Sequence, residues 1–144
     1  MDYKLDIHPM TIYLIHPYRD PIPANVHRNI QEAWTLATEL IQLGKHEEPN
    51  GKKFYTIAPI TPHLIYMHMD GCADEQWFLD VLMDQMAKQD SVLASERWKE
   101  SRGGVLELSE AVAIRKPIYY WPEDKDQLLI DSEIFVHNQY QLLD

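Results

Sequence analysis

The sequence predicts an α/β protein whose parallel sheet of four to five strands is covered by helices on both faces. Residues 10–15 form a continuous apolar and β-branched run, which is typical of a central strand buried on both faces. Apolar residues over 30–41 recur every three or four positions, which indicates an amphipathic helix that ends at Gly44. Such runs and periodicities alternate along the chain, and this alternation favours parallel strands joined by right-handed crossovers.

The remaining elements follow from the same signals. Asn25 is expected to cap the first helix, and Asp74 a second helix that reaches Lys88. Pro59 is expected to close a strand over residues 54–58, and further strands are expected at 91–94 and 117–121. The polar residues 45–53 indicate an exposed loop, and a third helix is expected to begin near Val105. The whole chain, 1–144, is interpreted as one domain with a core at 11–121 and an acidic tail at 122–144 that the pattern does not place.

Composition limits the classes of function. The 144 residues include 13 basic and 23 acidic side chains, and the net charge of −10 argues against a nucleic-acid partner, whose phosphates need a basic face. The single cysteine, Cys72, excludes an internal disulfide framework and favours a reducing compartment. No apolar run approaches 18 residues and the first residues do not resemble a signal peptide, so we expect a cytoplasmic protein without a membrane partner.

Two segments carry the candidate site. Ligands of doubly wound sheets bind beyond the carboxyl ends of the strands at the topological switch point, where the loops of two neighbouring strands meet. Tyr18 and Arg19 follow the first strand, and residues 101–107 follow the strand at 91–94. Gly103-Gly104 is expected to form a sharp turn whose N–H groups approach an anion, with Glu107 in the first turn of the next helix. The alternative is that Glu107 only favours the start of that helix.

The second of these segments resembles a known family. The pattern Ser101-x-Gly103-x-x-x-Glu107-Leu108-x-x-Ala111 is similar to a motif of the nucleoside 2-deoxyribosyltransferase-like superfamily. That superfamily holds deoxyribosyltransferases, nucleoside 5'-monophosphate N-glycosidases and uncharacterised phage-type relatives. Other similar pieces occur in the order of the family, and they are Ile12-Tyr13-Leu14, Pro17-Tyr18-Arg19, Pro59-Ile60-x-Pro62-His63 and Trp77-x-x-Asp80 with Asp90. The resemblance spans residues 12–121 and implies a flavodoxin-like (Rossmann-like) fold.

The resemblance also implies a reaction, the cleavage of an N-glycosidic bond by hydrolysis or by deoxyribosyl transfer. Its transition state places positive charge on the sugar, which a carboxylate can stabilise or attack while an acid protonates the leaving base. By analogy Glu107 is the nucleophile and Tyr13 a hydrogen-bonding partner in the site. Asp80 is expected to be the second carboxylate, with Asp84 as the alternative because the spacing from Asp80 to Asp90 is two residues longer than in the family.

One position in the motif predicts the form of the substrate. Six residues before the catalytic glutamate, nucleoside-transferring relatives carry an aspartate and nucleotide-hydrolysing relatives carry a serine; this chain has Ser101. A hydroxyl and the N–H groups of Gly103 and Gly104 can donate to a phosphate, and Arg19 can add a charge-assisted contact. We therefore expect a nucleoside 5'-monophosphate, although Glu100 weakens the positive field and Ser101 can also be read as a simple turn residue.

Tyr18 and His16 complete the expected substrate-binding residues, and His16 departs from the family. Relatives usually have small residues where this chain has Ile15-His16, which is expected to narrow the floor of the pocket. This departure motivates an alternative, a nucleotide-binding protein on the same fold that sequesters or senses a nucleotide without catalysis. Turnover, rather than ligand-dependent stabilisation alone, distinguishes the enzyme from the binder.

No cofactor and no metal are expected, but a second copy of the chain is. No phosphate-binding or dinucleotide-binding glycine motif occurs, and the cluster of potential ligands between His63 and Asp74 matches no closed zinc spacing. Relatives complete their sites across subunit contacts, so we expect a homodimer or higher homo-oligomer. A subunit contact is also consistent with the large apolar residues near the expected edges of the site: Trp77, Trp98, Tyr119, Tyr120 and Trp121.

Overall fold

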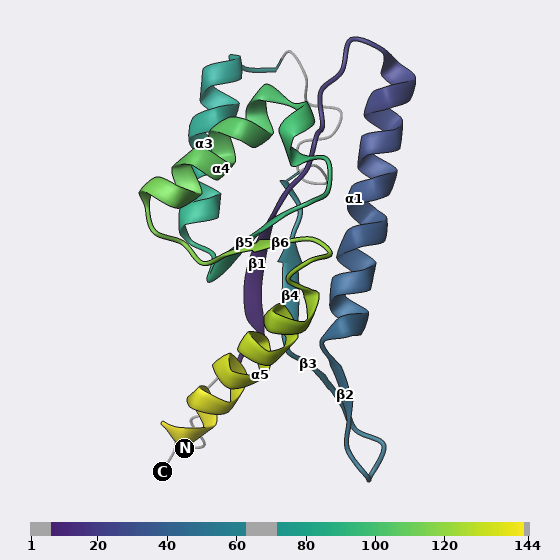
Figure 1. The fold of residues 1–144 in the computed structure, drawn as a ribbon, viewed down its shortest axis with the longest axis vertical. Coiled ribbons are helices and arrows are strands. Elements are labelled where there is room, and N and C mark those ends of the chain that lie inside the picture. The colour runs from purple at the N-terminus through teal and green to yellow at the C-terminus, as the bar shows by residue number, and fades with distance from the viewer. Residues whose placement is uncertain (1–6, 63–71, 143–144) are drawn as a thin grey trace.

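The computed structural model describes residues 7–62 and 72–142. Figure 1 shows the arrangement of the elements. In chain order they are β1 (Met10–Ile15), α1 (Pro23–Leu43), β2 (Lys45–Glu47), β3 (Lys53–Tyr55), β4 (Ile57–Ile60), α3 (Glu75–Ala87), β5 (Ser91–Ala94), the short 3-10 helix η1 (Trp98–Glu100), α4 (Arg102–Ala113), β6 (Ile118–Tyr120) and α5 (Lys125–Gln141).

The main sheet has four strands in the order β4-β1-β5-β6, and every neighbouring pair is parallel. This confirms the predicted α/β fold of the flavodoxin-like type. The chain leaves β1 for β4 on one side and then returns to β5 on the other side. The loops after β1 and β5 therefore meet at the switch point, as expected from strand order alone.

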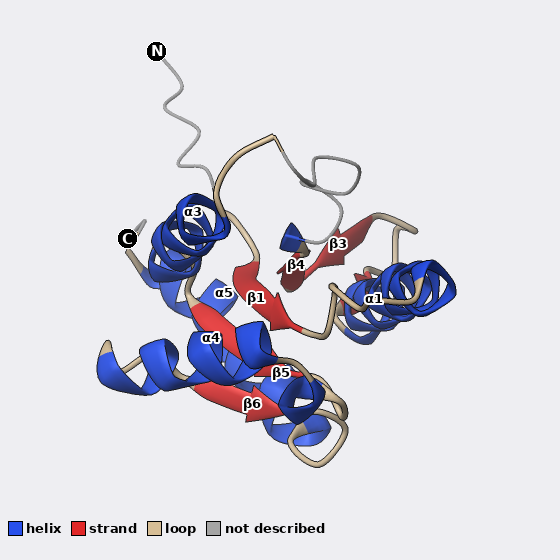
Figure 2. Cartoon of the chain, turned by 90° about the horizontal axis from the view of Figure 1, so that it is seen from above, coloured by secondary structure: helices blue, strands red, loops and turns tan. Residues whose placement is uncertain are grey.

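Residues of β1 alternate between the two layers of helices. Ile12 and Leu14 pack in one core cluster with Leu40 of α1 and Leu128 of α5. Tyr13 and Ile15 pack in a second cluster with residues of α3 and α4. Figure 2 shows α1 on one side of the sheet and α3 and α4 on the other. Burial on both faces explains why the run at residues 10–15 is almost entirely apolar, with Thr11 as its one polar residue, rather than alternating.

The expected strand at residues 54–58 is divided between two sheets. Residues 53–55 form β3, which pairs antiparallel with β2 in a hairpin at the end of the molecule away from α4 (Figure 1). Only β4 joins the main sheet, and Pro59 lies inside it rather than closing it. Because β4 is an edge strand, a proline without an N–H is tolerated there.

The tail that the sequence pattern left unplaced contains α5. Its buried residues, Leu128, Ser132 and Val136, recur every four positions, but one of the three is polar. The Ser132 hydroxyl lies 2.9 Å from that of Thr56, so its burial is compensated by a hydrogen bond. A stripe this narrow gives little hydrophobic periodicity, which explains why the helix was missed. In the described ranges, no helix combines the length and the apolar character needed to cross a membrane.

Candidate active site

The helix that carries Glu107 begins three residues earlier than expected. Ser101 is the residue before α4, and its hydroxyl accepts a hydrogen bond of 2.9 Å from the Gly104 N–H. This is the standard side-chain cap of a helix N-terminus. Gly103 and Gly104 therefore form the first turn of α4 rather than a sharp turn before it, and Glu107 lies in the second turn. The expected turn at Gly103-Gly104 was wrong because Ser101 caps the helix and both glycines are helical.

The two glycines of α4 meet different surroundings. A Cβ on Gly104 would collide with the carbonyl oxygen of Trp98 and would lie 3.0 Å from the Ser101 hydroxyl. A Cβ on Gly103 would meet no atom within 4 Å, and Gly103 lines the cavity described below. Gly104 thus lets η1 pack directly on the start of α4, whereas Gly103 keeps the cavity open.

This difference predicts opposite effects of two alanine substitutions. Gly104→Ala is expected to lower the free energy of unfolding by about 2 kcal/mol, because the backbone of η1 must move to relieve the overlap. Gly103→Ala is expected to leave stability unchanged or slightly higher, since alanine favours a helix more than glycine does. Chemical denaturation of the two variants measures both values. Equal stability of the two variants would contradict the packing of η1 on α4.

Tyr13 and Glu107 form a buried pair beneath the N-terminus of α4. The Tyr13 hydroxyl donates a hydrogen bond of 2.5 Å to Oε2 of Glu107, and both side chains are buried. Burial raises the pKa of Glu107 from 4.5 to about 7, and the hydrogen bond from Tyr13 lowers that pKa in part. An ionisable carboxyl that is buried in a cavity, with a pKa near neutrality, is typical of a group with a chemical role.

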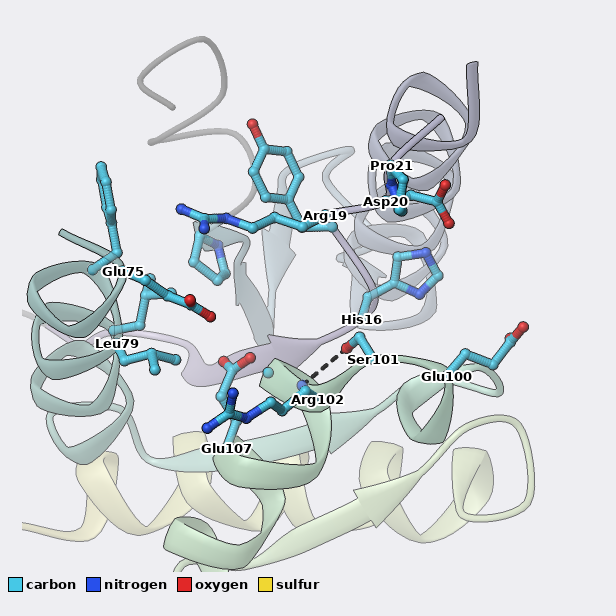
Figure 3. A pocket seen from close by; sticks show the side chains of 16 residues that line it. His16, Arg19, Asp20, Pro21, Glu75, Leu79, Glu100, Ser101, Arg102 and Glu107 are labelled. Atoms are coloured by element: carbon cyan, nitrogen blue, oxygen red, sulfur yellow. Dashed lines mark hydrogen bonds between the residues drawn. The ribbon is translucent and has the colours of Figure 1, made fainter. Parts of the chain in front are cut away.

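A cavity of about 380 Å³ opens above this carboxyl (Figure 3). The volume is within the range of pockets that hold small molecules. Four segments line it: the loop after β1, the end of the segment after β4, one face of α3, and the end of η1 with the start of α4. In that order they contribute His16, Tyr18, Arg19, Asp20 and Pro21; Pro62; Glu75, Phe78, Leu79 and Leu82; and Glu100, Ser101, Arg102, Gly103, Gly104 and Glu107. The structure therefore brings together all the residues expected to bind substrate, and Glu107, the expected nucleophile, lies among them.

Two guanidinium groups reach the cavity from different segments. Arg19 crosses from the loop after β1 towards α3, where its guanidinium lies 5.8 Å from the centre of the Phe78 ring. Arg102 comes from the first residue of α4 and extends beside Glu107 in Figure 3. Contact with an aromatic face helps to hold the Arg19 guanidinium in place.

Two acidic side chains in the cavity wall, Asp20 and Glu100, accept hydrogen bonds from neighbouring residues. The backbone N–H of Ile22 and the side-chain amide of Asn25 donate to Asp20, and these bonds lower its pKa. Glu100 accepts a hydrogen bond from the Arg97 guanidinium. Asn25, which was expected to cap α1, lies inside that helix instead, because α1 begins at Pro23.

Glu75 is the acidic residue of α3 that lines the cavity, whereas the sequence pointed to Asp80 or Asp84. Its side chain extends inward from the first turn of α3 (Figure 3). Asp80 is exposed, accepts a hydrogen bond from Gln76 and does not line the cavity. Asp84 is also exposed and forms an ion pair with Lys88. Phe78 is a buried residue of α3, and a residue three positions earlier on a helix shares its face, so helical spacing from an apolar position could have identified Glu75.

The other predicted features lie as follows. His16 is buried at the cavity, and its Nδ1 lies 2.7 Å from the Ser95 hydroxyl. Tyr119 and Trp121 pack in the core, which leaves Trp77 and Tyr120 exposed among the aromatic residues that suggested a subunit contact. The homodimer stays a prediction. Most of the considered metal cluster lies in residues 63–71, outside the described part, and the described residues contain no group of three potential ligands.

The fold and the cavity define a doubly wound α/β protein with a buried carboxyl and a small-molecule pocket at its switch point. Comparisons with protein-family models, curated proteins and solved structures give no match for this chain. The resemblance to a known family therefore rests on the motif from Ser101 to Ala111 and on the position of its residues at the cavity.

Proposed function

We propose that this protein cleaves the N-glycosidic bond of a nucleoside 5'-monophosphate, with Glu107 as the nucleophile. The observation that carries the proposal is the buried Tyr13–Glu107 pair at the bottom of a cavity that also holds two guanidinium groups. A carboxylate at that depth can act on a sugar, and the cations near the surface can hold a phosphate. The resemblance to the nucleoside 2-deoxyribosyltransferase-like superfamily supports the same reaction.

The chemistry uses two steps at Glu107. A carboxylate oxygen of Glu107 forms a bond to C1' of the sugar while the bond between C1' and the base nitrogen breaks, and the leaving base takes a proton from an acid. Water then attacks C1' and releases the sugar phosphate, or a second base attacks it in a transfer reaction. The Tyr13 hydroxyl stabilises the Glu107 carboxylate by a hydrogen bond before it attacks C1'. It stabilises the same carboxylate again when the bond between its oxygen and C1' breaks.

A free-base assay tests the proposed function. Wild-type protein is incubated with a panel of nucleosides and their 5'-monophosphates, and released base is quantified by chromatography. Base release from at least one monophosphate supports the proposal. Ligand-dependent thermal stabilisation without base release from any compound would contradict it and would favour the non-catalytic nucleotide-binding protein.

We propose Glu75 as the acid that protonates the leaving base, in place of Asp80. Both carboxylates lie on α3, but only Glu75 faces Glu107 across the cavity. Glu75→Gln is expected to lower kcat about 10²-fold, which is the usual contribution of a general acid. Asp80→Asn removes the same charge from the same helix and is expected to keep kcat within twofold of wild type. Steady-state kinetics on both variants tests this assignment. A larger loss of kcat in Asp80→Asn than in Glu75→Gln would contradict it.

Ser101 is proposed to distinguish the phosphorylated from the free substrate. Its hydroxyl caps Gly104 and can still donate its own hydrogen to a phosphate oxygen. Ser101→Asp keeps a good helix cap but places a carboxylate where the phosphate is expected. The ratio of kcat/KM for a deoxynucleoside 5'-monophosphate to that for the free deoxynucleoside should exceed one in wild type. We expect this ratio to fall at least tenfold in Ser101→Asp, about 1.4 kcal/mol. An unchanged ratio would show that the phosphate binds elsewhere.

A further inference from the structure

Arg97 joins segments that are far apart in the sequence. It lies between β5 and η1, and its guanidinium donates to the side-chain oxygen of Asn29 at 2.9 Å and to the carboxylate of Glu32, both on α1. Its Nε donates to Glu100, the last residue of η1. One planar group thus satisfies three acceptors, an arrangement that suits arginine and not lysine.

Asn29 extends this connection to the opposite wall of the cavity. Asn29 is 2% exposed, and its side-chain NH₂ donates to the backbone carbonyl of Tyr18 at 3.1 Å. The two partners fix the orientation of the amide, because Arg97 can only donate and a carbonyl can only accept. A continuous hydrogen-bonded path therefore runs from the loop after β1, through α1, to the segment before α4.

The ends of this path carry the residues assigned above to substrate binding. Tyr18 is followed directly by Arg19, and Glu100 by Ser101. Tyr13 and Glu107, by contrast, are held by the packing of β1 and α4 against each other. The path therefore fixes the two walls that would hold the phosphate and leaves the reacting pair to the core.

We propose that Arg97 and Asn29 are positioning residues that set the distance between the two substrate-binding loops across the switch point. The expected change in KM rests on the proposed function, whereas the expected change in the mobility of the two loops does not. Loss of the path should weaken binding in the ground state and in the transition state alike, which raises KM and leaves kcat nearly unchanged. A purely structural role would instead lower the fraction of folded protein, and with it kcat, at unchanged KM.

Three variants separate the parts of the path. Arg97→Met removes all three guanidinium contacts. Asn29→Asp keeps an acceptor for Arg97 but has no NH₂ for the Tyr18 carbonyl, so it releases only the loop after β1. Arg28→Met is the matched control, because Arg28 also pairs with Glu32, at 3.4 Å, and acts on the loop after β1 only through the charge of Asp20 and not through a described hydrogen bond.

The experiment combines amide hydrogen exchange with steady-state kinetics on the full chain. We expect Arg97→Met to speed exchange in residues 16–22 and 98–104, Asn29→Asp to speed it in 16–22 alone, and Arg28→Met to change neither. We further expect KM for the best monophosphate to rise about tenfold in Arg97→Met with kcat within threefold of wild type. Exchange unchanged in both loops of Arg97→Met would overturn the proposal, as would a fall in kcat at constant KM. If wild type releases no base while the exchange pattern appears, the positioning role stands and the proposed function falls.

Discussion

Replacing Glu107 with glutamine is expected to lower kcat for base release by about 10³-fold or more, which corresponds to about 4 kcal/mol of transition-state stabilisation. Glutamine has nearly the same shape, and its carbonyl can accept the hydrogen bond from Tyr13 that Oε2 now accepts. It cannot form the bond to C1' as a carboxylate does, and it brings no negative charge to the developing positive charge of the sugar. The change therefore removes the chemistry and keeps the packing.

Two controls make this result specific to the nucleophile. Circular dichroism and the midpoint of unfolding should show that Glu107→Gln is folded, and ligand-dependent stabilisation should show that it still binds the monophosphate. Glu110 lies one turn further along α4, and Glu110→Gln should retain near wild-type kcat because Glu110 does not line the cavity. A Glu107→Gln variant that turns over at a near wild-type rate would remove Glu107 from the reaction.

The same substitution is expected to change how stability depends on pH. In the folded protein the pKa of Glu107 is raised from 4.5 to about 7, and burial is the main cause. Between these two values the unfolded chain has lost this proton while the folded protein keeps it, so the folded state of wild type becomes less stable as pH rises. This cost is absent below pH 4.5 and is complete above pH 7. Glutamine does not ionise and carries no such cost.

The expected size follows from the displacement of the pKa. One pKa unit corresponds to about 1.4 kcal/mol, so the free energy of unfolding of Glu107→Gln relative to wild type should rise by about 3 kcal/mol between pH 4 and pH 8. Denaturant unfolding of both proteins across this range measures the difference, and any constant effect of the amide cancels. A pH-independent difference would show that Glu107 ionises normally and would remove the physical basis for its role.

The sequence was sufficient for the elements that have a strong pattern of their own. The strands β1 and β5 occupy the predicted residues, because a run buried on both faces is apolar at almost every position. Strand order then brought Arg19 and Ser101 to one cavity without any knowledge of side-chain contacts. The main sheet and most of the candidate site were therefore predictable.

Features that depend on tertiary contacts were not predictable in this way. The start of α4 was misplaced because the Ser101 cap and the packing of η1 on Gly104 decide it, and neither appears in hydrophobic periodicity. Asp80 does not line the cavity and Glu75 does, because tertiary packing decides which face of α3 meets the cavity. The path through Arg97 joins residues 65 to 68 positions apart, and no local pattern reveals it.

The covalent state of Glu107 during turnover tests the central claim most directly. Wild-type protein is mixed with a reactive deoxynucleoside 5'-monophosphate, quenched in acid within milliseconds to seconds, and analysed by mass spectrometry of the intact chain and its peptides. We predict a transient adduct with the mass of the deoxyribosyl 5'-phosphate group on the peptide that contains Glu107, absent from Glu107→Gln. Base release with no adduct at any time, or an adduct on another residue, would contradict Glu107 as the nucleophile.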